Sequence, residues 1–261
     1  YDVLVLDKGT IPGGRSSTKR RESGAYNHGC DALGGEIYAD LSINELLEGT
    51  DVRCDTRITS IQPNPEYVLL EDEKGFTWEA EAVLLTCPIP QLHALMPDLA
   101  PADWKEHPYI SNWSLICTGA SPVPIDLLNY ESNSIELMRN GIDEDESNVL
   151  IVQMVNEWSK KHLEKSRNEV TELILQELQS VSQDWLEPAA FHAHRWRFSR
   201  PLIQPQPLDE DRITFAGDAW AEPIGTVEAA LKSAEQAALE LIWKLHYAKK
   251  PEPISMQTTL F

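Results

Sequence analysis

The sequence predicts an α/β fold, and three segments carry that prediction. Residues 1–6 are a β-branched and aliphatic run that is typical of a buried parallel strand, and Asp7 follows directly. Residues 82–86 form a second such run, which stops at Pro88. Over 227–245, apolar residues recur at positions i, i+3, i+4 and i+7, which indicates a long amphipathic helix. Buried strands and a covering helix of this kind are typical of α/β domains.

Local patterns predict the other elements in chain order. A glycine- and hydroxyl-rich loop follows the first strand, and a turn then leads into a short strand near Gly29. Helical spacing and partial alternation predict the remaining helices and strands. The first half has a helix at 42–47, a strand at 51–61 and a hairpin at 67–70 and 77–80. The second half has strands at 111–119, 149–155, 191–199 and 212–216, and a helix at 169–181.

Charge and composition exclude several classes of protein. The 261 residues include 22 Lys and Arg against 42 Asp and Glu, which gives a net charge of −20. This acidity argues against a nucleic-acid backbone or an anionic membrane surface as partner. Hydrophobic residues make up 42% of the chain, enough for a sizeable core in one large domain or two small ones. No apolar run approaches the roughly 20 residues that span a bilayer.

The four cysteines lie far apart and form no CxxC pair. We therefore expect neither a zinc site nor a thioredoxin-type centre. Isolated cysteines are typical of a reducing cytosol, so we expect a cytoplasmic protein. The positions are Cys30, Cys54, Cys87 and Cys117.

Two N-terminal features suit nucleotide binding. In doubly wound sheets, an acid at the end of a strand, as Asp7 is, accepts hydrogen bonds from ribose hydroxyls. In the loop Pro12-Gly13-Gly14-Arg15, the glycines let the backbone approach a ligand, and the guanidinium can pair with phosphate. The plainer alternatives are a solvated acid and an ordinary surface turn.

A third feature lies near the C-terminus. Gly217-Asp218 follows the strand at 212–216, and Gly225-Thr226-Val227-Glu228 begins the long helix. A helix N-terminus has free N–H groups and a partial positive charge. It suits an anionic ligand, or a ring that becomes anionic on reduction. The plainer alternative is a capped terminal helix.

In this order and at these distances, the three features resemble those of FAD-dependent oxidoreductases of the amine-oxidase superfamily. The closer resemblance is to renalase-like flavoproteins. The PGGR-type loop and the Gly-Asp pair are widespread among such flavoproteins, and the likeness spans most of the chain. The other matching stretches are Asn27-His28-Gly29, 51–59, 86–91, Glu157-Trp158-Ser159, His194-Arg195-Trp196-Arg197-Phe198 and Val227-Glu228.

The resemblance implies FAD as cofactor and no metal. The residues expected to bind FAD are Asp7, Lys8, Gly13, Gly14, Arg15, Ile58, Gly217, Asp218, Gly225, Val227 and Glu228. The family's first strand and its GxGxxG turn would precede Tyr1, and a longer segment would precede the helix at 42–47. We expect the given chain to omit these parts, because an open central strand would leave backbone groups and apolar surface uncovered.

One predicted strand carries a candidate substrate wall. His192, His194, Trp196 and Phe198 alternate along 191–199 and would share one face. We expect this face to line a substrate cavity, and the alternative is that it packs into the core. His194, Trp196 and His28, which lies beside the cofactor loop in the family, are the expected catalytic-site residues. A zinc site would need a third ligand, and none is apparent in the sequence.

The resemblance also implies domains and an activity. A doubly wound, Rossmann-like FAD-binding domain would take 1–88 and 208–248. An interleaved α+β substrate domain with a mostly antiparallel sheet would take 89–207, and 249–261 would be a polar tail. The expected reaction takes a hydride from a dihydronicotinamide dinucleotide isomer or an amine and passes the electrons to dioxygen, giving hydrogen peroxide. The alternative is a non-catalytic protein of this fold that binds a partner through its acidic surface.

Overall fold

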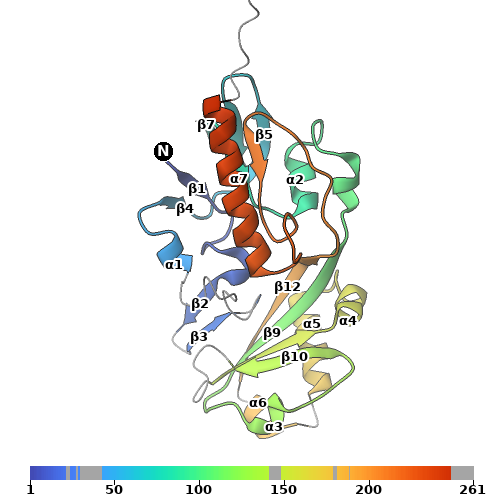
Figure 1. Cartoon of the computed structure of the whole chain (residues 1–261). Helices are drawn as coiled ribbons and strands as arrows, with labels where there is room; N and C mark the ends of the chain where they lie inside the picture. Colours follow the sequence, from blue (N-terminus) through green and yellow to red (C-terminus); the bar gives the residue numbers. More distant parts are fainter. Residues whose placement is uncertain are drawn as a thin grey trace, which may run out of the picture.

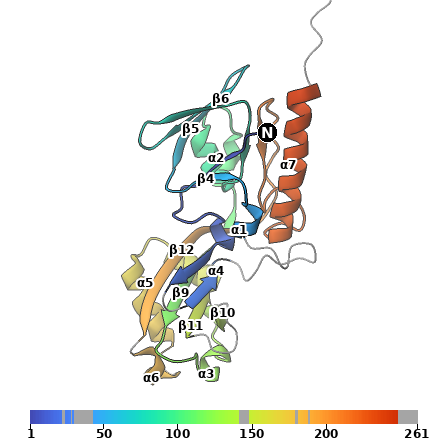
Figure 2. The same cartoon turned by 90° about the vertical axis from the view of Figure 1, so that its left-hand side faces the viewer.

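The structure, a computed structural model, has two lobes joined by long strands (Figure 1, Figure 2). It describes residues 1–21, 24–27, 29, 43–140, 148–178, 181–187 and 189–247. We call the lobe that contains helix α7 (Val227–Tyr247) the α7 lobe. We call the other the sheet lobe, because a four-stranded sheet forms its centre.

Two parallel strand pairs and one antiparallel sheet build the α7 lobe. Helix α7 packs along one parallel pair, and α2 packs against η2 and β5. Ile89, Leu92, Trp104 and Ile213 are fully buried in the core between these elements. The parallel pairs are β1 (Leu4–Leu6) with β4 (Asp51–Arg53) and β8 (Val83–Leu85) with β13 (Ile213–Phe215). The antiparallel sheet is β5 (Ile58–Pro63), β6 (Val68–Asp72) and β7 (Thr77–Ala80), and the helices are α1 (Ile43–Leu46), α2 (Ile89–Leu95) and the 3-10 helices η1 (Gly14–Ser16) and η2 (Ala102–Glu106).

The parallel direction of the first strand is confirmed. The strand predicted near residue 84 is present as β8, and it is also parallel to its neighbour. The expected burial of the first strand is wrong, because Val3 is 60% exposed and Leu4 is 38% exposed. Among the described strands, β1 has one hydrogen-bonded neighbour, so part of its apolar surface has no cover. By contrast, β8 and β13 lie beside α7, and Leu85 and Ile213 are buried. The described residues therefore contain the parallel strands as two separate pairs rather than as one continuous doubly wound sheet.

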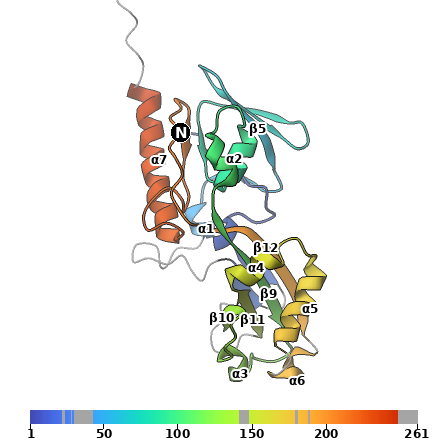
Figure 3. The same cartoon turned by 90° about the vertical axis from the view of Figure 1, so that its right-hand side faces the viewer.

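The sheet lobe contains the expected antiparallel sheet, with strand order β10-β11-β9-β12. One face is the main apolar core, where Trp113, Leu115 and Val152 pack with Val170 and Ile174 of α5 (Figure 3). The strands are β9 (Tyr109–Thr118), β10 (Ile135–Asn140), β11 (Val149–Met154) and β12 (Ala190–Pro201). The helices are α3 (Ile125–Leu128), α4 (Asn156–Lys161), α5 (Arg167–Glu177) and α6 (Gln183–Leu186).

The opposite face of this sheet is different in character. A hairpin of β2 (Thr18–Arg21) and β3 (Gly24–Asn27) lies against it, and Tyr26 is buried with Ile116 and Ile151. Next to this small cluster, Ser114 and Asn112 are buried polar residues, and the Ser114 hydroxyl donates to the Asn112 amide oxygen at 3.0 Å. This face therefore combines apolar and polar groups, unlike the apolar core on the other side.

Strands β9 and β12 are the longest in the described chain, and they run from the sheet lobe to the junction with the α7 lobe (Figure 3). Their pairing is interrupted between Trp196 and Arg200, where the Ser111 hydroxyl donates to the Arg197 carbonyl at 2.9 Å. The interruption lets the end of β12 change direction as it enters the junction.

Packing adds detail to the expected domains, whose boundaries remain predictions. Helices α2 and η2 belong to the core of the α7 lobe, although they lie C-terminal to residue 88. The β2–β3 hairpin lies against the sheet lobe, although it belongs to the N-terminal segment. The two lobes, as defined by packing, therefore do not follow the order of the chain.

Candidate functional site

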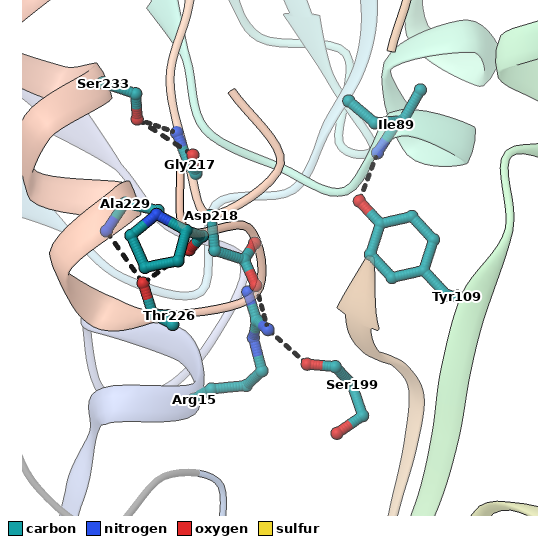
Figure 4. Close-up of polar contacts among 10 residues, drawn as sticks. Arg15, Ile89, Tyr109, Ser199, Gly217, Asp218, Thr226, Ala229 and Ser233 are labelled. Atoms are coloured by element: carbon teal, nitrogen blue, oxygen red, sulfur yellow. Dashed lines mark hydrogen bonds and ion pairs between the residues drawn. The ribbon is translucent and has the colours of Figure 1, made fainter. Parts of the chain in front are cut away.

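The candidate site lies at the junction of the lobes and is centred on an ion pair. Arg15 Nη1 lies 2.7 Å from Asp218 Oδ2, and the Arg15 guanidinium also donates to the Ser199 carbonyl (Figure 4). The Asp218 side chain is 10% exposed and that of Arg15 is 30% exposed. The pair joins the loop after β1, the end of β12 and the turn after β13. The structure therefore brings together Arg15 and Asp218, which are 203 residues apart in sequence.

Two glycines set the position of Arg15. Gly13 has φ 102° and Gly14 has φ 54°, a left-handed conformation that favours glycine. This turn leads directly into η1, which holds Arg15. Gly29 then lies so close that a Cβ on it would be 2.5 Å from the Arg15 carbonyl oxygen. The glycine-rich loop thus fixes the arginine backbone at the junction.

Asp218 is positioned by the turn that follows β13. Gly217 has φ 132°, and its N–H donates to Ser233 Oγ of α7 at 2.9 Å. The single Ser233 hydroxyl proton is shared between the carbonyls of Gly217 and Ala230, each 2.9 Å from Oγ. Because Ser233 is buried, these bonds tie the turn to the first half of α7 (Figure 4).

The start of α7 faces the same turn. The Gly225 N–H donates to the Asp218 carbonyl at 2.7 Å. Thr226 caps the helix, because its Oγ1 accepts from the Ala229 N–H at 3.0 Å and donates to the Pro223 carbonyl at 2.8 Å. Within the described chain, the N–H groups of Val227 and Glu228 donate to no acceptor. These two groups of the first turn are available to a ligand.

Tyr109 is a junction residue that the sequence patterns did not single out. Its hydroxyl accepts from the Ile89 N–H at the start of α2, at 3.2 Å (Figure 4). Burial raises the pKa of Tyr109 to about 12, and Asp218 adds to the shift. Burial also raises the pKa of the neighbouring Cys87 thiol to about 11, although Lys8 acts in the opposite direction. Both groups are therefore neutral at physiological pH.

Asp7 lies at the carboxyl end of β1, as predicted. Its Oδ1 accepts from the Gly9 N–H at 2.7 Å, and its carbonyl accepts from the Thr56 N–H at 3.0 Å. Thr56 is two residues from Ile58. The bond from Thr56 to Asp7 therefore brings Asp7 and Ile58, which are both expected to bind the cofactor, near each other. Lys8 points elsewhere: its Nζ donates to Gln91 of α2 at 3.0 Å. This half of the expected site is thus built around the end of β1.

The structure places two residues of the expected substrate wall on one face of the sheet, and their role as a wall stays a prediction. The rings of His194 and Trp196 lie 4.2 Å apart between centroids, on the sheet face that also holds Ser114. Placing Phe198 on this face was wrong: beyond the interruption in β12, it packs against Tyr109 in the core of the α7 lobe. His28 lies outside the described residues.

A cluster of metal ligands and a membrane-spanning helix are both absent from the described part of the chain. Among the described residues, no three His, Cys, Asp or Glu side chains converge as metal ligands would. No helix in the described part of the chain has the length and apolarity needed to cross a bilayer.

Comparison with known proteins gives a match to a protein-family model. The model of the flavin containing amine oxidoreductase family matches residues 34–242. Comparison with curated protein sequences gives no match.

Among solved structures, the chain is similar to putrescine oxidase. The wild-type enzyme bound to putrescine gives a TM-score of 0.52 at 15% identity, covering 74% of this chain and 50% of that one. A double mutant from a redesign of its cofactor binding gives 0.52 at 16% identity, with coverage of 80% and 53%. This chain thus spans about half the length of those structures, and the likeness is one of fold.

Proposed function

Because the chain belongs to the flavin containing amine oxidoreductase family, we propose that it is an FAD-dependent oxidoreductase whose cofactor site is the lobe junction. The observation that carries the proposal is the convergence of Arg15, Asp218 and the start of α7. A buried carboxylate, a guanidinium and two amides without acceptors are the donor and acceptor types that a dinucleotide requires.

The residues present fit FAD. Asp7 would accept hydrogen bonds from the adenosine ribose, as an acid at the end of a parallel strand does. Arg15 and Asp218 would hold the pyrophosphate and ribityl region, with Gly13 and Gly14 allowing close backbone approach. The N–H groups of Val227 and Glu228 would meet the flavin ring, and Gly225 and Gly217 shape the turn before them. Lys8 and Ile58 complete the set of residues that we propose near the cofactor.

When bound, FAD would supply the redox chemistry, namely hydride transfer from the substrate and reoxidation by dioxygen to give hydrogen peroxide. This chain would orient the cofactor through the Arg15–Asp218 pair and supply the positive end of α7. We propose a dihydronicotinamide dinucleotide isomer as hydride donor, as in renalase-like flavoproteins, and an amine as the second candidate. Three free cysteines among the described residues support a reducing, cytoplasmic location.

The substrate would lie against the sheet face that holds His194 and Trp196. Trp196 is half-buried and contacts His194, which suits a cavity wall. Trp196→Ala should slow flavin reduction in stopped-flow experiments and lower stability by less than the about 3–5 kcal/mol expected for a core tryptophan. Normal reduction together with a loss in that range would instead make it a core residue. Trp78→Ala, in the three-stranded sheet, is the control.

The alternative function is a non-catalytic protein that retains this fold and binds a partner through its acidic surface. The charge of −20 favours it. The test is the colour of the purified protein. A yellow preparation that bleaches on anaerobic addition of the hydride donor supports the oxidoreductase. A colourless protein that cannot be reconstituted with FAD supports the alternative.

A further inference from the structure

Arg200 lies at the lobe junction and contacts the turn before α7. It is the penultimate residue of β12 and follows Ser199, whose carbonyl binds Arg15. Its aliphatic part covers Gly225: a Cβ built on Gly225 would be 2.3 Å from Arg200 Cγ and 2.6 Å from Cδ. Arg200 can therefore occupy this position only because residue 225 has no side chain.

The two arginines of the junction differ in their partners. The Arg15 guanidinium is paired with Asp218. The Arg200 side chain is exposed, and across the described residues no hydrogen bond or ion pair engages its guanidinium. In the same turn, the Glu222 carboxylate accepts from the Ile224 N–H. Arg200 thus brings a positive charge, without an ion-pair partner among the described residues, to the turn before α7.

Gly225 links this charge to the rest of the site. Its φ is 79°, and its N–H donates to the Asp218 carbonyl. Two residues later, the N–H groups of Val227 and Glu228 have no acceptor within the described chain. A guanidinium and the positive end of a 21-residue helix therefore flank the same turn.

We infer that Arg200 is a cofactor-binding residue that stabilises the negative charge gained by the flavin on reduction. The inference rests on the proposed function, because it assigns the flavin end of FAD to the start of α7. Arg15 is neutralised by Asp218 and suits the part of the cofactor whose charge is constant. Arg200 has no such partner among the described residues, so its charge, although partly screened by solvent, suits a group whose charge changes.

The test compares Arg200→Gln with Arg200→Lys in the full chain loaded with FAD. Arg200→Gln should bind reduced flavin at least tenfold more weakly relative to oxidised flavin. This corresponds to a potential lowered by about 30 mV in a dye-coupled redox titration, since the couple transfers two electrons. Arg200→Lys should restore most of the shift. Arg197→Gln is the matched control, because Arg197 lies on the same strand and pairs with Glu164 at 2.8 Å.

Gly225→Ala gives an independent test of the contact. The added Cβ should displace Arg200 and lower the potential, as Arg200→Gln does. In the Arg200→Gln background, the same glycine substitution should not lower the potential further, although it still costs stability because of the positive φ. Thermal unfolding monitors that cost separately.

The outcomes are distinguishable. An Arg200→Gln protein that binds FAD at the wild-type potential overturns the inference and leaves the proposed function intact. Weaker binding of both redox states without a shift in potential also overturns it, because that pattern indicates a phosphate contact. A wild-type chain that binds no FAD overturns the proposed function and the inference together.

Discussion

Arg15 and Asp218 are paired with each other at the place we assign to a charged ligand. Such a pair contributes little to the free energy of unfolding by itself, because solvent screens the side of Arg15 that remains exposed. Its main effect is positional: both groups are held in one geometry before a ligand arrives. A ligand that contacts either group therefore meets side chains whose conformational entropy is already lost.

The first prediction concerns Asp7. Asp7→Ala removes the carboxylate at the end of β1, and a charge-assisted hydrogen bond of this kind contributes about 1.5–3 kcal/mol. FAD affinity should therefore fall about 10- to 100-fold, as measured by quenching of flavin fluorescence on binding. Asp51→Ala is the control, because Asp51 is exposed on the neighbouring strand and pairs with Arg53. Equal affinities for wild type and Asp7→Ala would remove Asp7 from the site.

The second prediction uses the partly buried thiol of Cys87. Its pKa is raised from 9.0 to about 11 by burial, so the folded state favours the neutral thiol. That stabilisation is fully present below pH 9 and is lost as the pH rises through 11. Relative to Cys87→Ala, the wild type should lose about 3 kcal/mol of unfolding free energy across this window, since one pKa unit is about 1.4 kcal/mol.

Urea unfolding at several pH values measures this difference. Tyr109, whose pKa is raised to about 12, titrates above this window in the wild type, and Cys87 contributes part of its shift. Cys54→Ala should show a smaller change, because burial raises the pKa of the Cys54 thiol less than that of Cys87. If the two cysteine variants behave alike, the loss of unfolding free energy at alkaline pH does not come from the junction.

Among the elements, α7 has the most direct connection to the site. Its first turn is capped by Thr226, and its second turn supplies Ser233, which bonds both backbone groups of Gly217. The helix therefore fixes the turn that carries Asp218 as well as covering β13. A shift of α7 would move the ligand-facing amides and Asp218 together.

The third prediction follows from Ser233. Ser233→Ala leaves the Gly217 N–H without its acceptor, and an unsatisfied buried group costs about 1–3 kcal/mol. Unfolding free energy should fall by this amount, and FAD affinity should fall as well, because the Asp218 turn loosens. Ser233→Thr retains the hydroxyl and should keep more of the affinity. A variant that loses stability but binds FAD normally would make Ser233 purely structural.

The helices and strands also show which features of the fold local sequence patterns predict. The helix predicted over 227–245 forms as α7, because its apolar stripe spans five turns and ends before a proline. The strand predicted over 51–61 is interrupted instead: Asp55 adopts φ 52° and separates β4 from β5. The alternation of apolar and polar residues along the sequence does not reveal that one residue in the run adopts a left-handed conformation. Helix α5 begins at Arg167 because Ser166 and Glu169 form a capping box, a signal that the apolar spacing alone did not use.

The candidate site was predictable to the extent that its parts resemble a family motif. The glycine loop, Asp7, Asp218 and the start of α7 carry local signals. Tyr109 and Arg200 do not, because their positions depend on where β9 and β12 end at the junction. The Arg200–Gly225 contact joins residues whose proximity no spacing rule gives. Long-range packing determines it.

At the scale of the whole molecule, the junction couples the two lobes. The fourth prediction is that FAD raises the unfolding free energy by about 2.7 kcal/mol at a free concentration of 100 times its Kd. Thermal unfolding with and without FAD measures this change. Hydrogen exchange should slow in the turn around Gly217 and in η1, while β10 and β11, which are distant from the junction, should be unaffected. Uniform protection across both lobes would indicate a general rather than a local effect.

The sequence distance between Arg15 and Asp218 has a consequence for biosynthesis. Strand β9 can pair with β11 and β12 once residues up to about 200 have been made, so the sheet lobe can fold while translation continues. The junction requires Asp218 and the first turns of α7, which are synthesised later. During that interval, the nascent chain presents Arg15 and the glycine loop without Asp218. Under the proposed function, cofactor capture is therefore a late step, and premature termination before α7 should yield a folded sheet lobe that cannot retain flavin.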